Sequence, residues 1–280
     1  MHVMQRGEES SRVKTLAGLR LVLARIAAQH GLGAPERETA FALGADEVDH
    51  VLGGGLRRAA LHEIHASWAD WPAAAGFGLA LAQRAAPERP LLWARPDFLD
   101  GEAGRLNGIG LAEFGVDPAL LSLVRGRDAQ AVLRAGVEAA RCKSLGAALI
   151  EVSEAPQALN LTATLRLARA AEKSGVTLFL LRVGLEDSRT GPPPSAAVSR
   201  WRACACPSRA LAANAPGAPG FYITLLRHRS GATERSWRLE WLRDQNLFHQ
   251  IPKPDDAALP RAFPALPADG AITPLRRRAG

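Results

Sequence analysis

The sequence predicts an α/β protein with a mostly parallel sheet flanked by helices and with antiparallel edge strands added late in the chain. Apolar strands alternate with helices between residues 60 and 182, the order expected when helices connect parallel strands. The strand segments AALIEV and TLFLLR are almost continuously apolar, as strands buried on both faces are. The later segments FYITLL and WRLEWL alternate apolar and polar residues, which favours antiparallel strands.

An amphipathic helix is predicted ahead of this core, at residues 13–30. Its apolar residues recur at helical spacing, and two glycines end the pattern; they are Leu16, Leu19, Val22, Leu23, Ile26, Gly31 and Gly33. Residues 34–40 then form a linker. We therefore predict an N-terminal helix and linker over residues 1–40, with the helix docked either on a neighbouring subunit or on its own core.

The core is predicted to extend over residues 41–243. Its strands are expected at residues 60–64, 91–93, 120–124, 147–152, 177–182, 221–226 and 236–242, and its helices at residues 73–85, 106–114, 128–143 and 159–174. Stretches rich in Gly and Pro at residues 184–195 and 212–220 mark loops. Beyond the last strand the chain is rich in proline and lacks periodicity, so residues 244–280 are predicted to form an extended, disordered basic tail.

The composition is typical of a cytoplasmic protein. There is no uncharged apolar run of about 18 residues that would span a membrane. The first residues, MHVMQRGEESS, lack the apolar region of a signal peptide. The cysteines Cys142, Cys204 and Cys206 form no set with histidines at metal-ligand spacing. We expect a cytoplasmic protein with no membrane span, metal or cofactor.

Positive charge is concentrated in the last third of the chain. The formal net charge is +7, and residues 200–280, with 13 basic and 6 acidic residues, account for all of it. Such a region can contact phosphates or an acidic partner, or can simply be solvated. The candidate contacts to DNA or to a partner are Arg227, Arg229, Phe248, Phe263, Arg276, Arg277 and Arg278.

A phosphate-binding loop is missing from the place where the order of elements predicts one. A Gly-rich turn at residues 53–55 leads to an apolar strand, a loop and an Ala-rich helix, but the loop reads HASWADWPAAAGF. The expected motif, G-x-x-x-x-G-K-[ST], supplies a lysine and free backbone N–H groups to the phosphates. The degenerate region contains Ala66, Trp68, Trp71, Pro72 and Gly76 instead. The two tryptophans either fill the space of the absent nucleotide, which we favour, or dock a partner.

The segment LGADEVDHVLGGGLRRAALHEIHA resembles the part of RecA in which a Leu-Gly-Gly-Gly turn precedes the strand that carries the phosphate loop. The order of the later segments, from LLWARPDFLD to LTATLRLARAAEKSGVTLFLLR, is similar to that of the RecA core, and the resemblance covers residues 41–242. A RecA-like chain of this length with a degenerate phosphate loop and a Pro-rich basic tail is similar to the ImuA family, also described as SulA-like.

This resemblance implies a role in damage-induced mutagenesis, within the SOS response and DNA repair. ImuA-family proteins act with ImuB, a Y-family polymerase homologue, and with an error-prone paralogue of the replicative polymerase α-subunit. The resemblance further implies cores that form homo-oligomers edge to edge and contact with DNA.

Carrying RecA's functional positions over residue by residue indicates lost ATP chemistry. The acidic end of the magnesium-binding strand is matched by Glu151, whereas the glutamate that activates water falls near Pro96, with Asp97 as the nearby carboxylate. RecA's second DNA-binding loop corresponds to residues 184–195, and the first is nearly deleted after Glu151.

These features predict a non-catalytic accessory protein of damage-induced translesion DNA synthesis, which binds an ImuB-like Y-family polymerase homologue through its tail and its N-terminal helix. Two alternatives stay open. One is a divergent DNA-dependent ATPase of the recombinase class, which would have to bind ATP without the lysine. The other is a SulA-like cell-division inhibitor.

Overall fold

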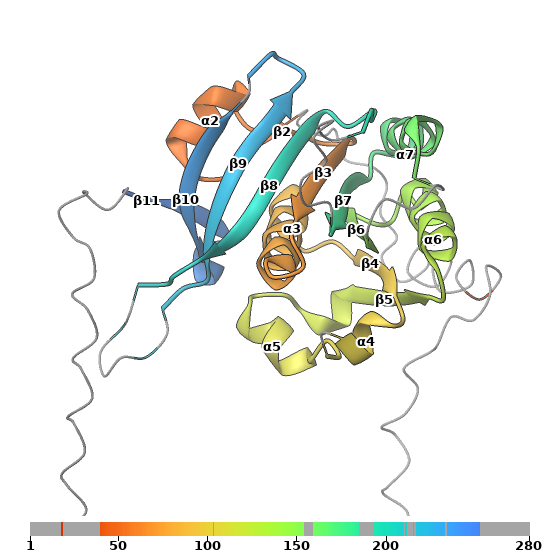
Figure 1. The fold of residues 1–280 in the computed structure, drawn as a ribbon, viewed down its shortest axis with the longest axis horizontal. Helices are drawn as coiled ribbons and strands as arrows, with labels where there is room; N and C mark the ends of the chain where they lie inside the picture. The colour runs from red at the N-terminus through yellow and green to blue at the C-terminus, as the bar shows by residue number, and fades with distance from the viewer. Residues whose placement is uncertain are drawn as a thin grey trace, which may run out of the picture.

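One nine-stranded sheet runs through the molecule, in the order β11-β10-β9-β8-β3-β7-β6-β4-β5 (Figure 1). The computed structural model describes residues 18, 40–102, 104–153, 159–184, 193–209, 211, 215, 217–232 and 234–252. In chain order the strands are β3 (Leu61–Ala66), β4 (Leu91–Pro96), β5 (Leu121–Gly126), β6 (Ala147–Ser153), β7 (Thr177–Val183), β8 (Ser199–Cys206), β9 (Gly220–His228), β10 (Arg235–Leu242) and β11 (Leu247–Ile251). A separate small sheet pairs β1 (Ala40–Phe41) with β2 (Leu56–Arg57).

The sheet combines a parallel part with an antiparallel extension. The strands from β8 to β5 run parallel, and β9, β10 and β11 continue the sheet in antiparallel pairs. Every residue of β3, β4 and β7 is buried, as expected where helices cover both faces. On β9, by contrast, Phe221, Ile223 and Leu225 are buried while Tyr222 between them is exposed. This arrangement confirms the predicted α/β fold and its late antiparallel strands.

Helices cover the two faces of the parallel part. In chain order the helices of the described residues are α2 (Asp46–Leu52), α3 (Trp71–Ala85), α4 (Leu99–Glu102), α5 (Gly108–Glu113), α6 (Ala129–Arg141) and α7 (Leu161–Ser174). Helix α3 packs on one face, and α6 and α7 pack on the other (Figure 1). The side chains of Asp128 and Asn160 cap α6 and α7 by accepting hydrogen bonds from N–H groups of the first turn. Within the described residues, no helix is both long and apolar enough to cross a membrane.

An aromatic cluster joins α3 to the antiparallel extension. The ring centroid of Phe77, on α3, lies 6.2 Å from that of Trp201 on β8, 5.9 Å from Phe221 on β9 and 5.4 Å from Phe248 on β11. All four side chains are almost completely buried. Such pairs add to the stabilisation that comes from burying their apolar surface. One helix therefore holds strands that are far apart in the sequence.

The first and last parts of the described core lie side by side. The Phe248 N–H donates a hydrogen bond to the Leu43 carbonyl oxygen, 3.0 Å away. The Arg84 guanidinium, on α3, donates to the Ala42 carbonyl (2.6 Å from Nη2) and to the Asn246 carbonyl (2.9 Å from Nη1). Residues 42–43 are therefore held against the start of β11.

The predicted start of the tail was wrong, because residues 247–251 form β11 and pair with β10. Phe248, a candidate partner contact, is instead a core residue with no exposed surface. Its ring packs against Phe77 and Trp241. The physical reason is that removing a phenylalanine side chain from water is favourable. Residues 253–280, with Phe263, Arg276, Arg277 and Arg278, lie outside the described residues, as does the predicted helix at 13–30 apart from Gly18.

Among the described residues, several further elements had no prediction: the short strands β1 and β2, the strand β8, and the helices α2 and α4. In β8, Arg200 and Arg202 alternate with the buried Trp201 and Ala203, so charged residues interrupt the apolar run by which the other strands were predicted. Helix α2 ends at Gly53, whose φ of 73° is a left-handed conformation that suits glycine. In place of the helix predicted at residues 106–114, the structure has the shorter helix α5, at residues 108–113.

The substitution Phe248→Ala is expected to lower the free energy of unfolding by about 3–5 kcal/mol, because it leaves a cavity among buried aromatic rings. Urea unfolding followed by far-UV circular dichroism measures this. The exposed neighbour His249 offers a control, and His249→Ala is expected to change stability by less than about 0.5 kcal/mol. Equal effects of the two substitutions would contradict the packing of β11 into the core.

Candidate functional site

The carboxyl ends of the parallel strands meet at the loop between β3 and α3, where α/β proteins of this kind place their ligands. Residues 67–70 form this loop. If Ala66, the last residue of β3, takes the place of the first glycine in G-x-x-x-x-G-K-[ST], the second glycine falls on Trp71 and the lysine on Pro72. Ala73 then stands where the Ser or Thr would be. The positions that the motif residues would take are therefore defined in the structure.

Trp71 closes the gap between the start of α3 and β6. Its indole N–H donates a hydrogen bond to Oε1 of Glu151, and the indole N–H of Trp93 donates to Oε2 at 3.1 Å. All three side chains are buried. Both carboxylate oxygens of Glu151, the residue matched to a magnesium-binding position, thus have protein donors. Within the described residues, no group of three or more His, Cys, Asp or Glu side chains is placed to hold a metal ion.

Arg95 completes this cluster from β4. Its Nε lies 3.5 Å from Oε2 of Glu151, and its guanidinium stands over the rings of Trp71 and Trp93, 5.2 and 5.9 Å from their centroids. Arg95 has no exposed surface, and none of its guanidinium nitrogens makes a hydrogen bond within the described part of the chain. The buried positive charge of Arg95 is therefore stabilised by the ion pair with Glu151 and by the π faces of Trp71 and Trp93.

The charge state of Glu151 depends on opposing effects. Burial raises the pKa of Glu151 above its ordinary value, while the positive charge of Arg95 and the N–H donors of Trp71 and Trp93 act in the opposite direction. On its other side, Arg95 lies 3.9 Å from Asp100, which pairs with Arg125 at 3.1 Å. The cluster is thus a chain of alternating charges that runs from β6 through β4 and α4 to β5.

The start of α3 carries a negative charge where a phosphate would need a positive one. Asp70 precedes α3; its Oδ1 accepts a hydrogen bond from the Ala205 N–H at 2.9 Å, and its Oδ2 accepts one from the Ser67 hydroxyl at 2.8 Å. Burial opposes ionisation of Asp70, but these bonds and one from Cys204 outweigh it and lower its pKa. A carboxylate at this helix end repels phosphate, and Pro72 removes one of the N–H donors.

Trp68 occupies the other side of the loop. It is 44% exposed and lies over Gly184, where an added Cβ would come within 2.7 Å of the indole Nε1. Trp71 therefore fills space in the core, as favoured from the sequence, whereas Trp68 keeps a solvent-facing surface. Gly76 lies on α3 opposite the rings of Phe221 and Phe114, which an added Cβ would meet at ordinary contact distances.

The basic candidates lie away from this loop. Arg227 is exposed on β9, paired in register with Arg200, and Arg229 is exposed in the turn that follows. Asp97, the carboxylate expected near the position of the catalytic glutamate, is exposed, and its N–H donates to the Gly126 carbonyl. The structure thus brings Trp71 and Glu151 together but leaves Arg227 and Arg229 at the far end of the sheet.

A second buried cluster, which the sequence did not indicate, surrounds Glu63 on β3. Its carboxylate lies 3.0 Å from Arg200, 3.8 Å from Arg182 and 3.4 Å from His65, and it accepts a hydrogen bond from the Ser195 hydroxyl at 2.6 Å. Burial works against ionisation, but the bonds from His65 and Ser195 and the charge of Arg200 lower the pKa of Glu63. The only sequence signal was a glutamate between two histidines in an apolar strand.

His62 faces the opposite side of β3 from His65, because the two residues are three positions apart in a strand, where side chains alternate between faces. Its Nδ1 lies 2.7 Å from the Ser199 hydroxyl and its Nε2 lies 2.8 Å from the Arg57 carbonyl oxygen. The neutral imidazole fits both partners, with Nε2–H donating to the carbonyl and Nδ1 accepting. Burial lowers the pKa of His62 to about 4. His62 is therefore a neutral part of the core rather than a metal ligand or a base.

No protein-family model matches the sequence, and no curated protein matches it either. Among solved structures, a crystal structure of the RadB recombinase is similar to this chain, with a TM-score of 0.51 and 13% sequence identity. The match covers 76% of this chain and 100% of that one. The chain has a RecA-like fold. At this identity the likeness concerns the fold alone, and the resemblance to the ImuA family stays a prediction.

Breaking the Arg95–Glu151 pair is expected to cost more than replacing both partners. Arg95→Met or Glu151→Gln alone leaves a buried group without its counterpart and is expected to lower the unfolding free energy by about 3–5 kcal/mol. The double variant should lose clearly less than the sum. A double-mutant cycle by urea unfolding measures the coupling, and the exposed pair Arg57–Glu172 serves as the control, with coupling below about 1 kcal/mol. Additive losses at Arg95 and Glu151 would refute the coupling.

The lowered pKa of His62 predicts a loss of stability in acid. Below pH 6.5 the unfolded chain binds a proton at this residue, whereas the folded chain does so only near pH 4. His62 should therefore destabilise the protein by about 3 kcal/mol as the pH falls through this interval, at about 1.4 kcal/mol per pKa unit. Urea midpoints across the interval should fall less steeply for His62→Gln than for the unaltered protein or for His249→Gln. Parallel curves would contradict the assignment.

Proposed function

We propose that this protein is a non-catalytic accessory factor of damage-induced translesion DNA synthesis that binds an ImuB-like Y-family polymerase homologue. In this role the RecA-like domain works by holding partners rather than by turning over ATP. The error-prone paralogue of the polymerase α-subunit would be reached through that homologue. The partner part of the proposal comes from the resemblance to the ImuA family, and the non-catalytic part comes from the site.

The observation that carries the non-catalytic part is the position of Trp71. ATP needs a cation at the lysine position, backbone donors around its phosphates and an acidic side chain for Mg²⁺. Here Pro72 stands at the lysine position, and Asp70 places a carboxylate at the start of α3, where the phosphates would bind. The indole N–H of Trp71 donates a hydrogen bond to Glu151, the carboxylate that would otherwise face Mg²⁺. At each of the three positions, the residue present thus disfavours ATP binding. This supports a domain without nucleotide chemistry.

Exposed apolar side chains near the same edge of the sheet support a docking role. Trp68 is 44% exposed on the β3–α3 loop, Phe98 is 46% exposed between β4 and α4, and Ile109 is 70% exposed on α5. Helices α4 and α5 lie next to each other at this end of the molecule (Figure 1). Large apolar side chains in solvent are common at protein interfaces, with Trp especially enriched at the energetic centre.

Affinity purification of the tagged protein from DNA-damaged cells of its own species tests the proposal. We expect a Y-family polymerase homologue to co-purify with the full chain. A chain ending at Pro252 keeps β11 and Phe248 in place, so it tests the remaining tail without disturbing the core. A chain beginning at Ala40 tests the predicted N-terminal helix. Trp68→Ala tests the loop, with Leu165→Ala, an exposed leucine on α7, as its matched control.

The outcomes separate the three functional classes. Loss of the polymerase homologue in one variant but not in Leu165→Ala would locate the contact. Recovery of cell-division proteins without a polymerase would favour the SulA-like role and overturn the proposal. Titration of the purified protein with ATP and Mg²⁺ is expected to show no saturable binding. Saturable binding that is lost on Glu151→Gln, in a variant that still unfolds cooperatively, would favour the ATPase alternative.

A further inference from the structure

The antiparallel extension presents one face without a helix over it. Helix α3 packs on the inner face of β8 and β9, and α6 and α7 cover the parallel strands from β3 to β5. Within the described residues, the outer face of β9 and β10 is bare of helices (Figure 1). A sheet face in solvent is ordinarily lined by small polar residues or mixed charges. This one carries an aromatic ring between arginines.

Tyr222 lies at the centre of this outer face. It is the only tyrosine of the chain and is 41% exposed, although its neighbours Phe221 and Ile223 are buried on the other side. In the register of the sheet it pairs with Cys204 on β8 and with Arg238 on β10. Side chains that pair across strands stand about 5 Å apart at Cβ, so these groups are immediate neighbours.

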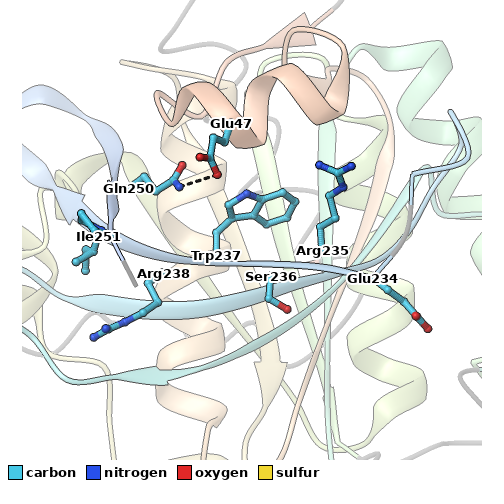
Figure 2. Close-up of a pocket in the computed structure, with 9 residues that line it drawn as sticks. Glu47, Glu234, Arg235, Ser236, Trp237, Arg238, Gln250 and Ile251 are labelled. Atoms are coloured by element: carbon cyan, nitrogen blue, oxygen red, sulfur yellow. Dashed lines mark hydrogen bonds between the residues drawn. The ribbon is translucent and has the colours of Figure 1, made fainter. Parts of the chain in front are cut away.

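Arginines flank the ring on both sides. Arg202 on β8 is exposed and pairs with Thr224, which places it diagonally next to Tyr222. Figure 2 shows that Arg238 and Ser236 point to the opposite side of β10 from Trp237, so Arg238 reaches the outer face. The groove on the inner side, between α2 and β10, is spanned by the hydrogen bond from Gln250 to Glu47 and is a different place.

The open part of this face is positively charged. Thr224 and Ser236 add hydroxyl groups 2.9 Å apart next to the ring. Two acidic groups next to the ring are already engaged: Glu240 is buried and lies 3.6 Å from Arg209, and Asp70 accepts hydrogen bonds from Ser67 and Ala205. The exposed Glu234 lies on the same side, before the start of β10 and beyond Ser236 from Arg238. Arg227, paired with Arg200 two positions beyond Leu225, continues the basic track along β9.

We propose that this outer face of β8, β9 and β10 binds single-stranded nucleic acid. The Tyr222 ring stacks against an unpaired base, and Arg202 and Arg238 contact the phosphates on either side, with Arg227 further along the strand. An exposed aromatic ring within a basic surface suits single strands, because every base offers a π face but only an unpaired base can stack on a side chain. The inference does not rest on the proposed function, since none of its residues belongs to the β3–α3 loop or to the cluster around Glu151.

Fluorescence anisotropy with a labelled single-stranded oligonucleotide, titrated with the full-length protein over a series of salt concentrations, tests the inference. Tyr222→Ser is expected to weaken binding about tenfold, while Tyr222→Phe, which keeps the ring, retains it. Arg202→Gln combined with Arg238→Gln should reduce the dependence of log K on log salt by about 1.4, because about 0.7 is lost for each phosphate contact to a single strand. Arg166→Gln with Arg169→Gln, exposed on α7, is the control of equal charge change.

Several results would overturn the inference. One is an absence of binding by the unaltered protein at low salt. Another is an equal loss in the α7 control, which would mean charge attraction without a site. A third is Tyr222→Ser that binds as tightly as Tyr222→Phe, with thermal unfolding showing that both are folded. If the outer-face variants keep nucleic-acid binding but lose a co-purifying protein, the face docks a protein instead. Retention of the polymerase homologue by variants that lose oligonucleotide binding would keep the two proposals separate.

Discussion

The burial of Glu151 is the constraint on which the rest of the core depends. A carboxylate with no exposed surface must be neutralised or supplied with donors, or it destabilises the fold by several kcal/mol. Trp71, Trp93 and Arg95 supply what it needs from two other elements, α3 and β4. Satisfying one side chain therefore fixes the start of α3 against β6 and sets β4 beside them. A nucleotide-binding domain would leave this space for phosphates and a metal ion.

Because α3 is anchored at its start, its remaining length can order the antiparallel extension. Phe77 lies almost two turns further along α3 and packs against rings from β8, β9 and β11, while Arg84 near the end of α3 holds residues 42 and 246. The same helix thus acts on the parallel strands and on the late strands. The two parts of the sheet share one hydrophobic core because they share this helix.

The sequence predicted the elements whose pattern is local and missed those that depend on distant contacts. Apolar runs such as TLFLLR specify a buried strand by themselves, and the lack of a lysine near Trp71 indicated a degenerate loop. The partners of Glu151 were not predictable, because Trp93 and Arg95 are about 60 residues away and their side chains meet it only through the strand order. Strand β11 was missed because LFHQI is short and lies next to prolines, and its place is set by Phe77 and by Leu43.

The side-by-side placement of residues 42–43 and 246–248 has a consequence for how the flanking segments act. The segments before residue 40 and after residue 252 are attached three and four residues away from this contact, in which Arg84 and the Leu43–Phe248 hydrogen bond join the two ends of the described core. For a partner that touches both segments, the second contact is intramolecular, with an effective concentration that can reach the order of millimolar. Two contacts that are each weak would then give a long-lived complex, and cutting either segment would cost more than its own contact is worth.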